Sequence, residues 1–184
     1  YISDDRAKLH KDTWQSWTSY KIEFSEEQKK EVDNYRIIVQ KINGALEEVG
    51  RALGHRVWQS IEYYIANYPT VRQAMNYQPK QNEKGKIIWV PTNSELTGEL
   101  KKAMRTAFED QIVQKIMPKL RGIETRDKRG KNSLDKIEDL LVTYDFASLQ
   151  EDFQIAREQG YGQFIWNSAK YLDKKEENES QEEK

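Results

Sequence analysis

The sequence predicts a mainly α-helical fold: a helical bundle, then a C-terminal helical extension, with room for one short β-hairpin near residues 86–90. Two observations predict it. Apolar residues recur three or four positions apart over long stretches, which is typical of amphipathic helices. Only 36% of the 184 residues are apolar and 33% are charged, so the core must be narrow and the helices largely solvated.

Residues 1–24 are irregular and aromatic, and we expect them to form an N-terminal packing arm. The aromatic side chains at their spacing fit one short helical face: Trp14, Trp17, Tyr20 and Phe24. Ser25 followed by Glu26 and Glu27 predicts the start of a helix, because the serine oxygen can accept a free backbone amide and acids favour the positive helix end.

The first long helix is predicted by an apolar stripe that Gly50 can terminate: Val32, Tyr35, Ile38, Val39, Ile42, Leu46 and Val49. After residues 51–56, a second helix is predicted by another apolar set: Val57, Trp58, Ile61, Tyr64 and Ile65. Pro69 should stop it. For residues 70–92, around Ile87-Ile88-Trp89-Val90, a hairpin and an extended loop remain equally open.

A third helix, capped by Asn93 or Ser94, is expected to reach Pro118 with one apolar face: Leu96, Leu100, Ala103, Met104, Ala107, Phe108, Ile112, Val113 and Ile116. Residues 121–132 read as a mobile charged loop.

A fourth helix should begin at Ser133 with Leu134, Ile137, Leu140 and Leu141 as its apolar residues. A fifth should run from about Ser148 to Gln159, with Phe153 and Ala156 inward. Gly160-Tyr161-Gly162 would end it before the apolar anchor of Phe164, Ile165 and Trp166. The predicted domains are the arm 1–24, a helical domain 25–122, an extension 123–169 and a disordered charged tail 170–184.

Composition excludes several classes of function. The chain has no cysteine, so it has no disulfide, thiolate metal site or thiol nucleophile, and it suits a reducing cytoplasm. Thirty basic and 31 acidic residues create no overall field for nucleic acid or membrane. No apolar run approaches the roughly 20 residues of a membrane span, so we expect no membrane partner.

The motifs of common catalytic sites are missing. A phosphate-binding loop needs G-x-x-x-x-G-K-[ST], and Gly85-Lys86 lacks the earlier glycine and the following hydroxyl. His10 and His55 are the only histidines and lie far apart in sequence, which argues against a metal site. Adjacent acids such as Glu47-Glu48 and Glu138-Asp139 are typical of a solvated helix face. We therefore expect no catalytic residue, no metal and no enzymatic activity in this chain alone.

Two groups of basic residues could bind anions. Lys119, Arg121, Arg126 and Arg129, with Lys115, Lys128 and Lys131, could neutralise phosphates. The alternative is a solvated loop relieved by Glu124 and Asp127, because the segment lacks interleaved aromatic residues for base stacking. Arg56 lies at a predicted helix start, where a cation opposes the helix dipole, so it could meet an anion; the alternative is a local surface ion pair.

Three segments, in the expected order, resemble the C-terminal lid region of bacterial AAA+ ATPases of the MoxR and McrB-like group. KINGALEEVGRALGHRVWQSIEYYI contains Gly54-His55-Arg56, which is similar to the Gly-x-Arg turn that leads into the sensor 2 helix. AFEDQIVQKIMPKLRG at 107–122 resembles the helix after the lid, and GYGQFIWNSA at 160–169 resembles the aromatic terminus. The resemblance covers residues 25–169.

The resemblance implies that residues 25–122 are a lid, with Arg56 and Gly54 as nucleotide-sensing residues. The parent protein would bind ATP or GTP with Mg²⁺ in a separate AAA+ core of the same polypeptide, and no cofactor would bind this chain alone. Implied partners are neighbouring subunits of a ring, and a nuclease subunit and DNA in a cytoplasmic restriction or defence system. The lid would couple nucleotide state to ring assembly.

Two other functions remain open. The chain could be a self-contained helical interaction module, or adaptor, in which Arg56 is paired within its own domain. It could also be a DNA-binding module that uses residues 119–131. The lid hypothesis instead requires Arg56 to be exposed, on a concave surface beside aromatic side chains.

Overall fold

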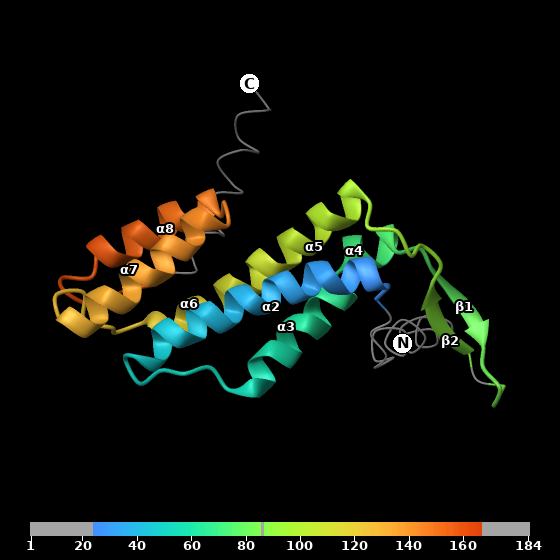
Figure 1. Ribbon diagram of the computed structural model, residues 1–184, viewed down its shortest axis with the longest axis horizontal. Helices are drawn as coiled ribbons and strands as arrows, with labels where there is room; N and C mark the ends of the chain where they lie inside the picture. The colour runs from blue at the N-terminus through green and yellow to red at the C-terminus, as the bar shows by residue number, and fades with distance from the viewer. Residues whose placement is uncertain (1–23, 86, 167–184) are drawn as a thin grey trace, which may run out of the picture. The chain divides into compact units, whose positions relative to one another are not determined.

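The structure, a computed structural model, describes residues 24–85 and 87–166 (Figure 1). These residues are mainly helical, with one two-stranded antiparallel sheet, so the predicted fold class is confirmed. His10, most of the aromatic arm (Trp14, Trp17 and Tyr20) and the tail 170–184 lie outside the described residues. Within the described part, each helix is too short or too polar to cross a membrane.

The chain forms two compact units that interleave in sequence. The described part of unit 1 contains residues 24–35, 58–85 and 87–108, and that of unit 2 contains 36–57 and 109–166. The unit boundaries fall within helices α2 (Glu26–Glu47), α3 (His55–Asn67) and α5 (Gly98–Gln111). They do not coincide with the boundary predicted after residue 122, and that division into lid and extension stays a prediction.

In unit 1, α2 begins with a capping box. The Ser25 hydroxyl accepts a hydrogen bond from the Gln28 amide at 3.3 Å, and the Gln28 side chain accepts one from the Ser25 amide at 3.0 Å. The predicted helix start is therefore confirmed. Gln28 is buried and also donates to the carbonyl of Asn93 at 3.2 Å. This bond ties the start of α2 to the segment before α5.

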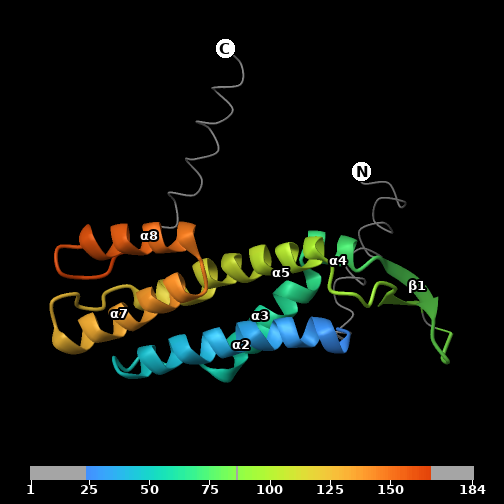
Figure 2. The ribbon, with the colours of Figure 1, turned by 45° about the horizontal axis from the view of Figure 1, so that its top comes forward.

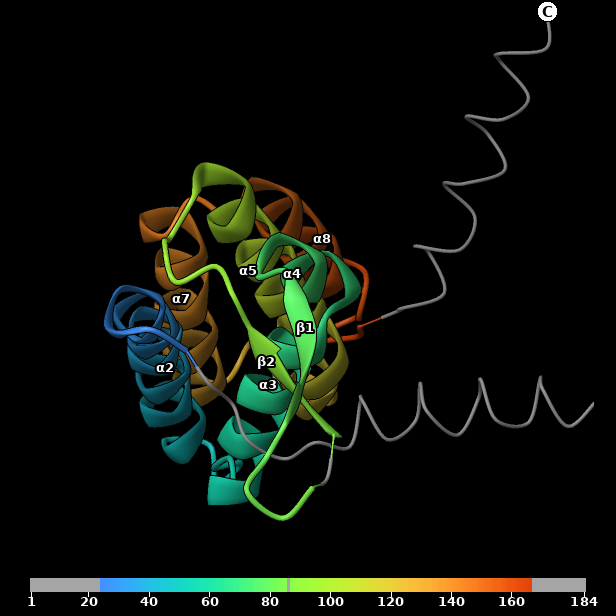
Figure 3. The ribbon, with the colours of Figure 1, turned by 90° about the vertical axis from the view of Figure 1, so that its right-hand side faces the viewer.

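Residues 69–92 hold one helix that the sequence did not predict, and the hairpin. Pro69 ends α3 but also begins α4 (Pro69–Ala74), where its missing amide costs nothing. β1 (Tyr77–Gln81) pairs antiparallel with β2 (Ile87–Pro91), with Tyr77 opposite Pro91 and Gln81 opposite Ile87. Figure 3 shows the two paired strands. Of the two alternatives for this segment, the hairpin is correct.

The third predicted helix begins later than expected. Thr97 caps α5, because its hydroxyl accepts the Leu100 amide at 3.2 Å. Asn93 instead accepts the Glu95 amide and donates to the Ala74 carbonyl, which holds the residues after β2. Within unit 1, the rings of Tyr35 and Phe108 stack at 4.5 Å. The buried apolar residues of this unit are Phe24, Val32, Tyr35, Ile61, Ile65, Ala66, Val71, Met75, Leu100, Met104, Ala107 and Phe108.

In unit 2, α2 ends in a Schellman motif. Gly50 has φ +70°, its amide donates to the Glu47 carbonyl at 3.0 Å, and the Arg51 amide donates to the Leu46 carbonyl at 2.9 Å. Gly50 thus terminates this helix, as predicted.

The prediction that Pro118 ends the third helix is wrong. After α5 the chain continues through one π-helical turn, η1 (Ile112–Ile116), into α6 (Met117–Leu120). Pro118 lies in the first turn of α6, where a residue without an amide is tolerated. The wider π turn lets the chain pass the proline with Ile112, Ile116, Met117 and Leu120 still buried.

α7 (Lys128–Thr143) begins five residues before the predicted start at Ser133. Asp127 caps it by accepting the amides of Arg129 at 3.0 Å and Gly130 at 3.2 Å. Ser133 is instead buried and donates to the Ala45 carbonyl of α2 at 2.7 Å. α8 (Ala147–Glu158) matches the fifth predicted helix, and Phe153 and Ala156 are buried as expected.

α7 and α8 lie side by side in both views of Figures 1 and 2. Arg157 of α8 joins them through Asp135 and through Glu138 at 2.7 Å. Phe153 contacts Phe164 with ring centroids 5.0 Å apart, so the segment after α8 folds back on it. The other buried apolar residues of unit 2 include Ile38, Val39, Ile42, Ala45, Leu46, Ile123, Leu134, Ile137, Leu141, Phe146, Leu149 and Trp166.

Candidate functional site

Arg56 is the second residue of α3 and is exposed. No hydrogen bond or ion pair joins its side chain to another residue of the described ranges, and the first turn of α3 contains no acid. A cation here faces the positive end of the helix dipole, which costs about 0.3–1 kcal/mol. Local stability therefore does not explain Arg56.

Gly54 precedes α3 and is also exposed. Its carbonyl accepts the Val57 amide at 2.9 Å, so Gly54 occupies the N-cap position. A Cβ atom built on Gly54 would meet nothing within 4 Å. Packing within the described residues therefore does not require glycine here, which leaves space beside Arg56.

The turn before Gly54 is held by side chains that the sequence analysis did not single out. Arg51 donates to the backbone carbonyls of Lys119, at 3.1 Å, and Arg121. Asn43 of α2 accepts the amide of Leu53 and donates to Glu47 at 2.7 Å. Arg51 and Asn43 thus join the segment before α3 to α2 and to the end of α6. Sequence periodicity could not reveal these contacts, because both side chains are polar and one bonds 68 residues away.

The predicted phosphate-binding residues Lys119, Arg121, Arg126 and Arg129 are all exposed. They come from the end of α6, the segment 121–127 and the first turn of α7. That segment is not a free loop: Gly122 donates to Phe164, Phe164 to Ile123, and Thr125 to Gly162, each at 2.8 Å. Glu124 and Gln163 form an isolated antiparallel bridge.

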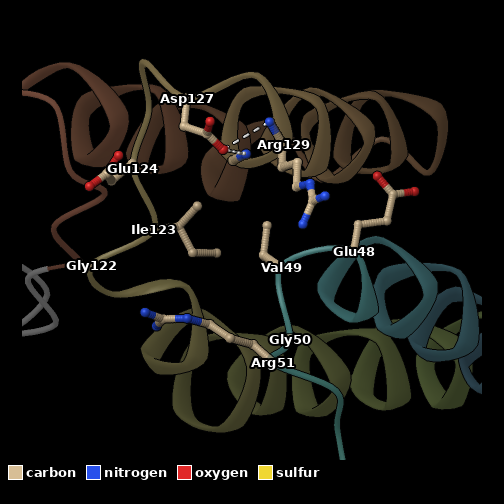
Figure 4. A pocket seen from close by; sticks show the side chains of 10 residues that line it. Glu48, Val49, Gly50, Arg51, Gly122, Ile123, Glu124, Asp127 and Arg129 are labelled. Atoms are coloured by element: carbon tan, nitrogen blue, oxygen red, sulfur yellow. Dashed lines mark hydrogen bonds between the residues drawn. The ribbon is translucent and has the colours of Figure 1, made fainter.

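An open pocket of about 440 Å³ lies between the turn after α2 and the start of α7 (Figure 4). Arg129 extends from α7 above the opening and Arg51 from the turn below it. Glu48, Glu124 and Asp127 also line this pocket, so its charge is mixed. Neither Arg56 nor Arg126 lines it, so it does not unite the predicted site residues.

Glu48 at the edge of this pocket is held by α7. Lys136 donates to one of its carboxylate oxygens and Asn132 to the other at 2.8 Å. The hydrogen bond from Lys136 is the main reason that the pKa of Glu48 lies below its ordinary value of 4.5. Because the folded-state pKa is the lower one, the contribution to stability is present above about pH 4.5 and is lost as the pH falls through the folded-state pKa.

We expect Lys136→Gln to raise the pKa of Glu48 towards 4.5, because it removes the strongest donor to the carboxylate. The measurement is an NMR titration of the Glu48 side-chain carboxyl. Lys131→Gln, at another exposed lysine of α7, is the matched control and should leave this pKa in place. An unchanged Glu48 pKa in Lys136→Gln would contradict the assigned hydrogen bond.

No group of three or more His, Asp or Glu side chains comes together as a metal site within residues 24–85 and 87–166. In the acid pairs Glu47-Glu48 and Glu138-Asp139, side chains accept hydrogen bonds from neighbouring residues. Glu47 accepts from Asn43, and Glu138 accepts from Gln154 at 2.8 Å and from Arg157. Glu47 and Glu138 are therefore engaged in local hydrogen bonds.

Residues 8–182 match a protein family described as "Domain of unknown function (DUF8727)". No curated protein and no solved structure matches the chain.

Proposed function

The chain belongs to the DUF8727 family, and we propose that this member is the nucleotide-sensing lid of a McrB-like AAA+ NTPase, with Arg56 as the cation that meets the nucleotide phosphates. The nucleotide-binding core would be another part of the same polypeptide. Neighbouring ring subunits, a nuclease subunit and DNA are the partners that the proposal includes.

The observation that carries this proposal is that Arg56 is exposed and has no partner among the described residues. The lid requires an exposed guanidinium at the start of the helix that follows the Gly-x-Arg turn. The adaptor alternative requires Arg56 to be paired within its own domain. Arg56 is exposed, and no pair forms among the described residues, which supports the lid. The predicted concave surface around Arg56 stays part of the proposal.

The surrounding turn supports the same role. A residue that senses phosphate must be held in a reproducible position, because a preorganised cation costs no reorganisation when charge develops. Asn43 and Arg51 fix the segment before α3 by side-chain hydrogen bonds to backbone groups. Gly54 has no neighbour within 4 Å of its Cβ position, so a phosphate group could approach this helix start closely.

The role of Arg56 in this mechanism is electrostatic. ATP or GTP with Mg²⁺, bound in the core, would supply the reacting phosphoryl group. The planar guanidinium of Arg56 matches phosphate geometry and stays charged at physiological pH. It would bind a phosphate oxygen when the lid closes and favour the closed, assembled state of the ring. General acid or base catalysis would come from the core.

We expect Arg56→Ala in the full-length protein to lower kcat for nucleotide hydrolysis about 100-fold, the effect typical of removing one preorganised charge-stabilising group. Arg56→Lys should recover only part of the activity, because an ammonium cannot make two parallel hydrogen bonds. The measurement is steady-state phosphate release, after size-exclusion chromatography shows that each variant assembles.

Arg36→Ala is the matched control, since Arg36 is another exposed arginine with no bond to a described residue. It should hydrolyse nucleotide at the wild-type rate. Unchanged turnover in a folded, assembled Arg56→Ala variant would reject the sensor role and favour the adaptor.

A further inference from the structure

Tyr161 has an unusual setting in unit 2. Its side chain is 96% exposed and its backbone has φ +48°, a conformation that costs free energy for a residue other than glycine. Exposure of an aromatic ring in a strained turn has no packing explanation within the described residues. The turn between Gly160 and Gly162 therefore holds the Tyr161 ring in solvent.

The turn itself is tightly constrained. A Cβ on Gly160 would lie 1.5 Å from the carbonyl oxygen of Gln163, and Gly162 has φ +100°. The Gln163 amide donates to the Gly160 carbonyl at 3.0 Å. Beyond the turn, Phe164 and Trp166 are buried and anchor the chain. The backbone of Tyr161 is thus held in place, with its side chain in solvent.

Backbone pairing places Arg126 near the turn that carries Tyr161. The bridge between Glu124 and Gln163 and the hydrogen bond from the Thr125 amide to the Gly162 carbonyl at 2.8 Å bring the segment 124–125 alongside the residues that follow Tyr161. The Arg126 Nε lies 3.4 Å from the position of a Cβ on Gly162, the residue after Tyr161. The Arg126 side chain therefore lies beside the turn that carries Tyr161.

The segment that contains Arg126 has an excess of basic residues. Residues 119–131 hold six basic and two acidic side chains, although the whole chain has a net charge of −1. The six cations are exposed, and none has an ion pair with a described residue: Lys119, Arg121, Arg126, Lys128, Arg129 and Lys131. The acids near this segment are Asp127, which caps α7, and Glu48 and Glu124, which line the pocket with Arg129; Glu138 and Glu158 line a second pocket with Thr125.

We propose that this surface, formed by Tyr161, Arg126 and the basic residues of 119–131, binds single-stranded nucleic acid. One base stacks on the Tyr161 ring, while Arg126 and its neighbours neutralise the adjacent phosphates. An exposed ring favours a single strand, since the bases of a duplex are already stacked. The site does not depend on Arg56 or on the proposed nucleotide-sensing role.

The test is fluorescence anisotropy with the full chain and a fluorescein-labelled 12-nucleotide oligothymidylate. Wild type should bind, and log K should fall with log salt concentration with a slope of about −2 to −3, as expected for three or four phosphate contacts with a single strand. Tyr161→Asn should weaken binding about 5- to 100-fold, the range for loss of one base–aromatic stack. Asparagine tolerates positive φ and the side chain is exposed, so folding should be preserved.

Three further variants make the result specific. Tyr161→Phe should bind like wild type, since it keeps the ring. Arg126→Gln should weaken binding and reduce the salt slope by about 0.7, whereas Lys102→Gln, at an exposed lysine of α5, should change neither. Absence of binding at low salt would overturn the proposal. Equal affinity of Tyr161→Asn and wild type would also overturn it, because it would leave only non-specific attraction of a polyanion.

Discussion

Phe153→Ala is expected to lower the free energy of unfolding by about 3–5 kcal/mol, the usual cost of removing a fully buried phenylalanine ring. Phe153 is completely buried on α8 and packs against the Phe164 ring at 5.0 Å. Its loss therefore opens a cavity and also frees the segment that carries Tyr161. Urea unfolding followed by circular dichroism at 222 nm measures the change.

Val142→Ala is the control for Phe153→Ala. Val142 lies on α7 of the same unit but is 54% exposed, so its truncation should change stability by at most about 0.5 kcal/mol. If Phe153→Ala cost no more than Val142→Ala, the packing of α8 against the C-terminal segment would be wrong.

Gly130→Ala should destabilise the protein by about 3 kcal/mol, at the upper end of overpacking effects. Gly130 is buried in the first turn of α7, and a Cβ there would lie 2.0 Å from the Glu124 carbonyl oxygen and 3.1 Å from Ile123. A backbone carbonyl cannot rotate away as a flexible side chain can. The chain at 123–125 would have to move and lose its pairing with 162–164.

Gly44→Ala gives the opposite sign and serves as the control. Gly44 lies inside α2, and a Cβ there meets nothing within 4 Å. Alanine is better than glycine in a helix interior by about 1 kcal/mol, so the variant should be more stable than wild type. Urea unfolding of the pair, in parallel, separates helix propensity from steric conflict. Similar effects of both substitutions would refute the close approach of α7 to Glu124.

Local patterns in the sequence determined those helices whose caps and apolar stripes involve residues close together in the chain. The capping box at Ser25, the apolar stripe of α2 and the glycine at its end act through neighbours in sequence, so they were readable without a structure. α8 and its inward Phe153 were predicted for the same reason. The exposed arginine at the start of α3 could also be named, because a cation at that position opposes the helix dipole whatever surrounds it.

Tertiary structure decided the features that depend on residues far apart in the chain. The sequence predicts a helix end at Pro118, but the chain stays helical through the π turn and α6, with the residues around Pro118 buried. α7 begins at Lys128, before the predicted start at Ser133, because Asp127 caps it while Gly130 packs on Glu124. The basic segment has no aromatic residue of its own, and only its pairing with residues 162–164 brings it to the turn that carries Tyr161. Propensity and capping are local energies, whereas burial and strand pairing depend on which distant segments meet, and sequence periodicity carries no record of that.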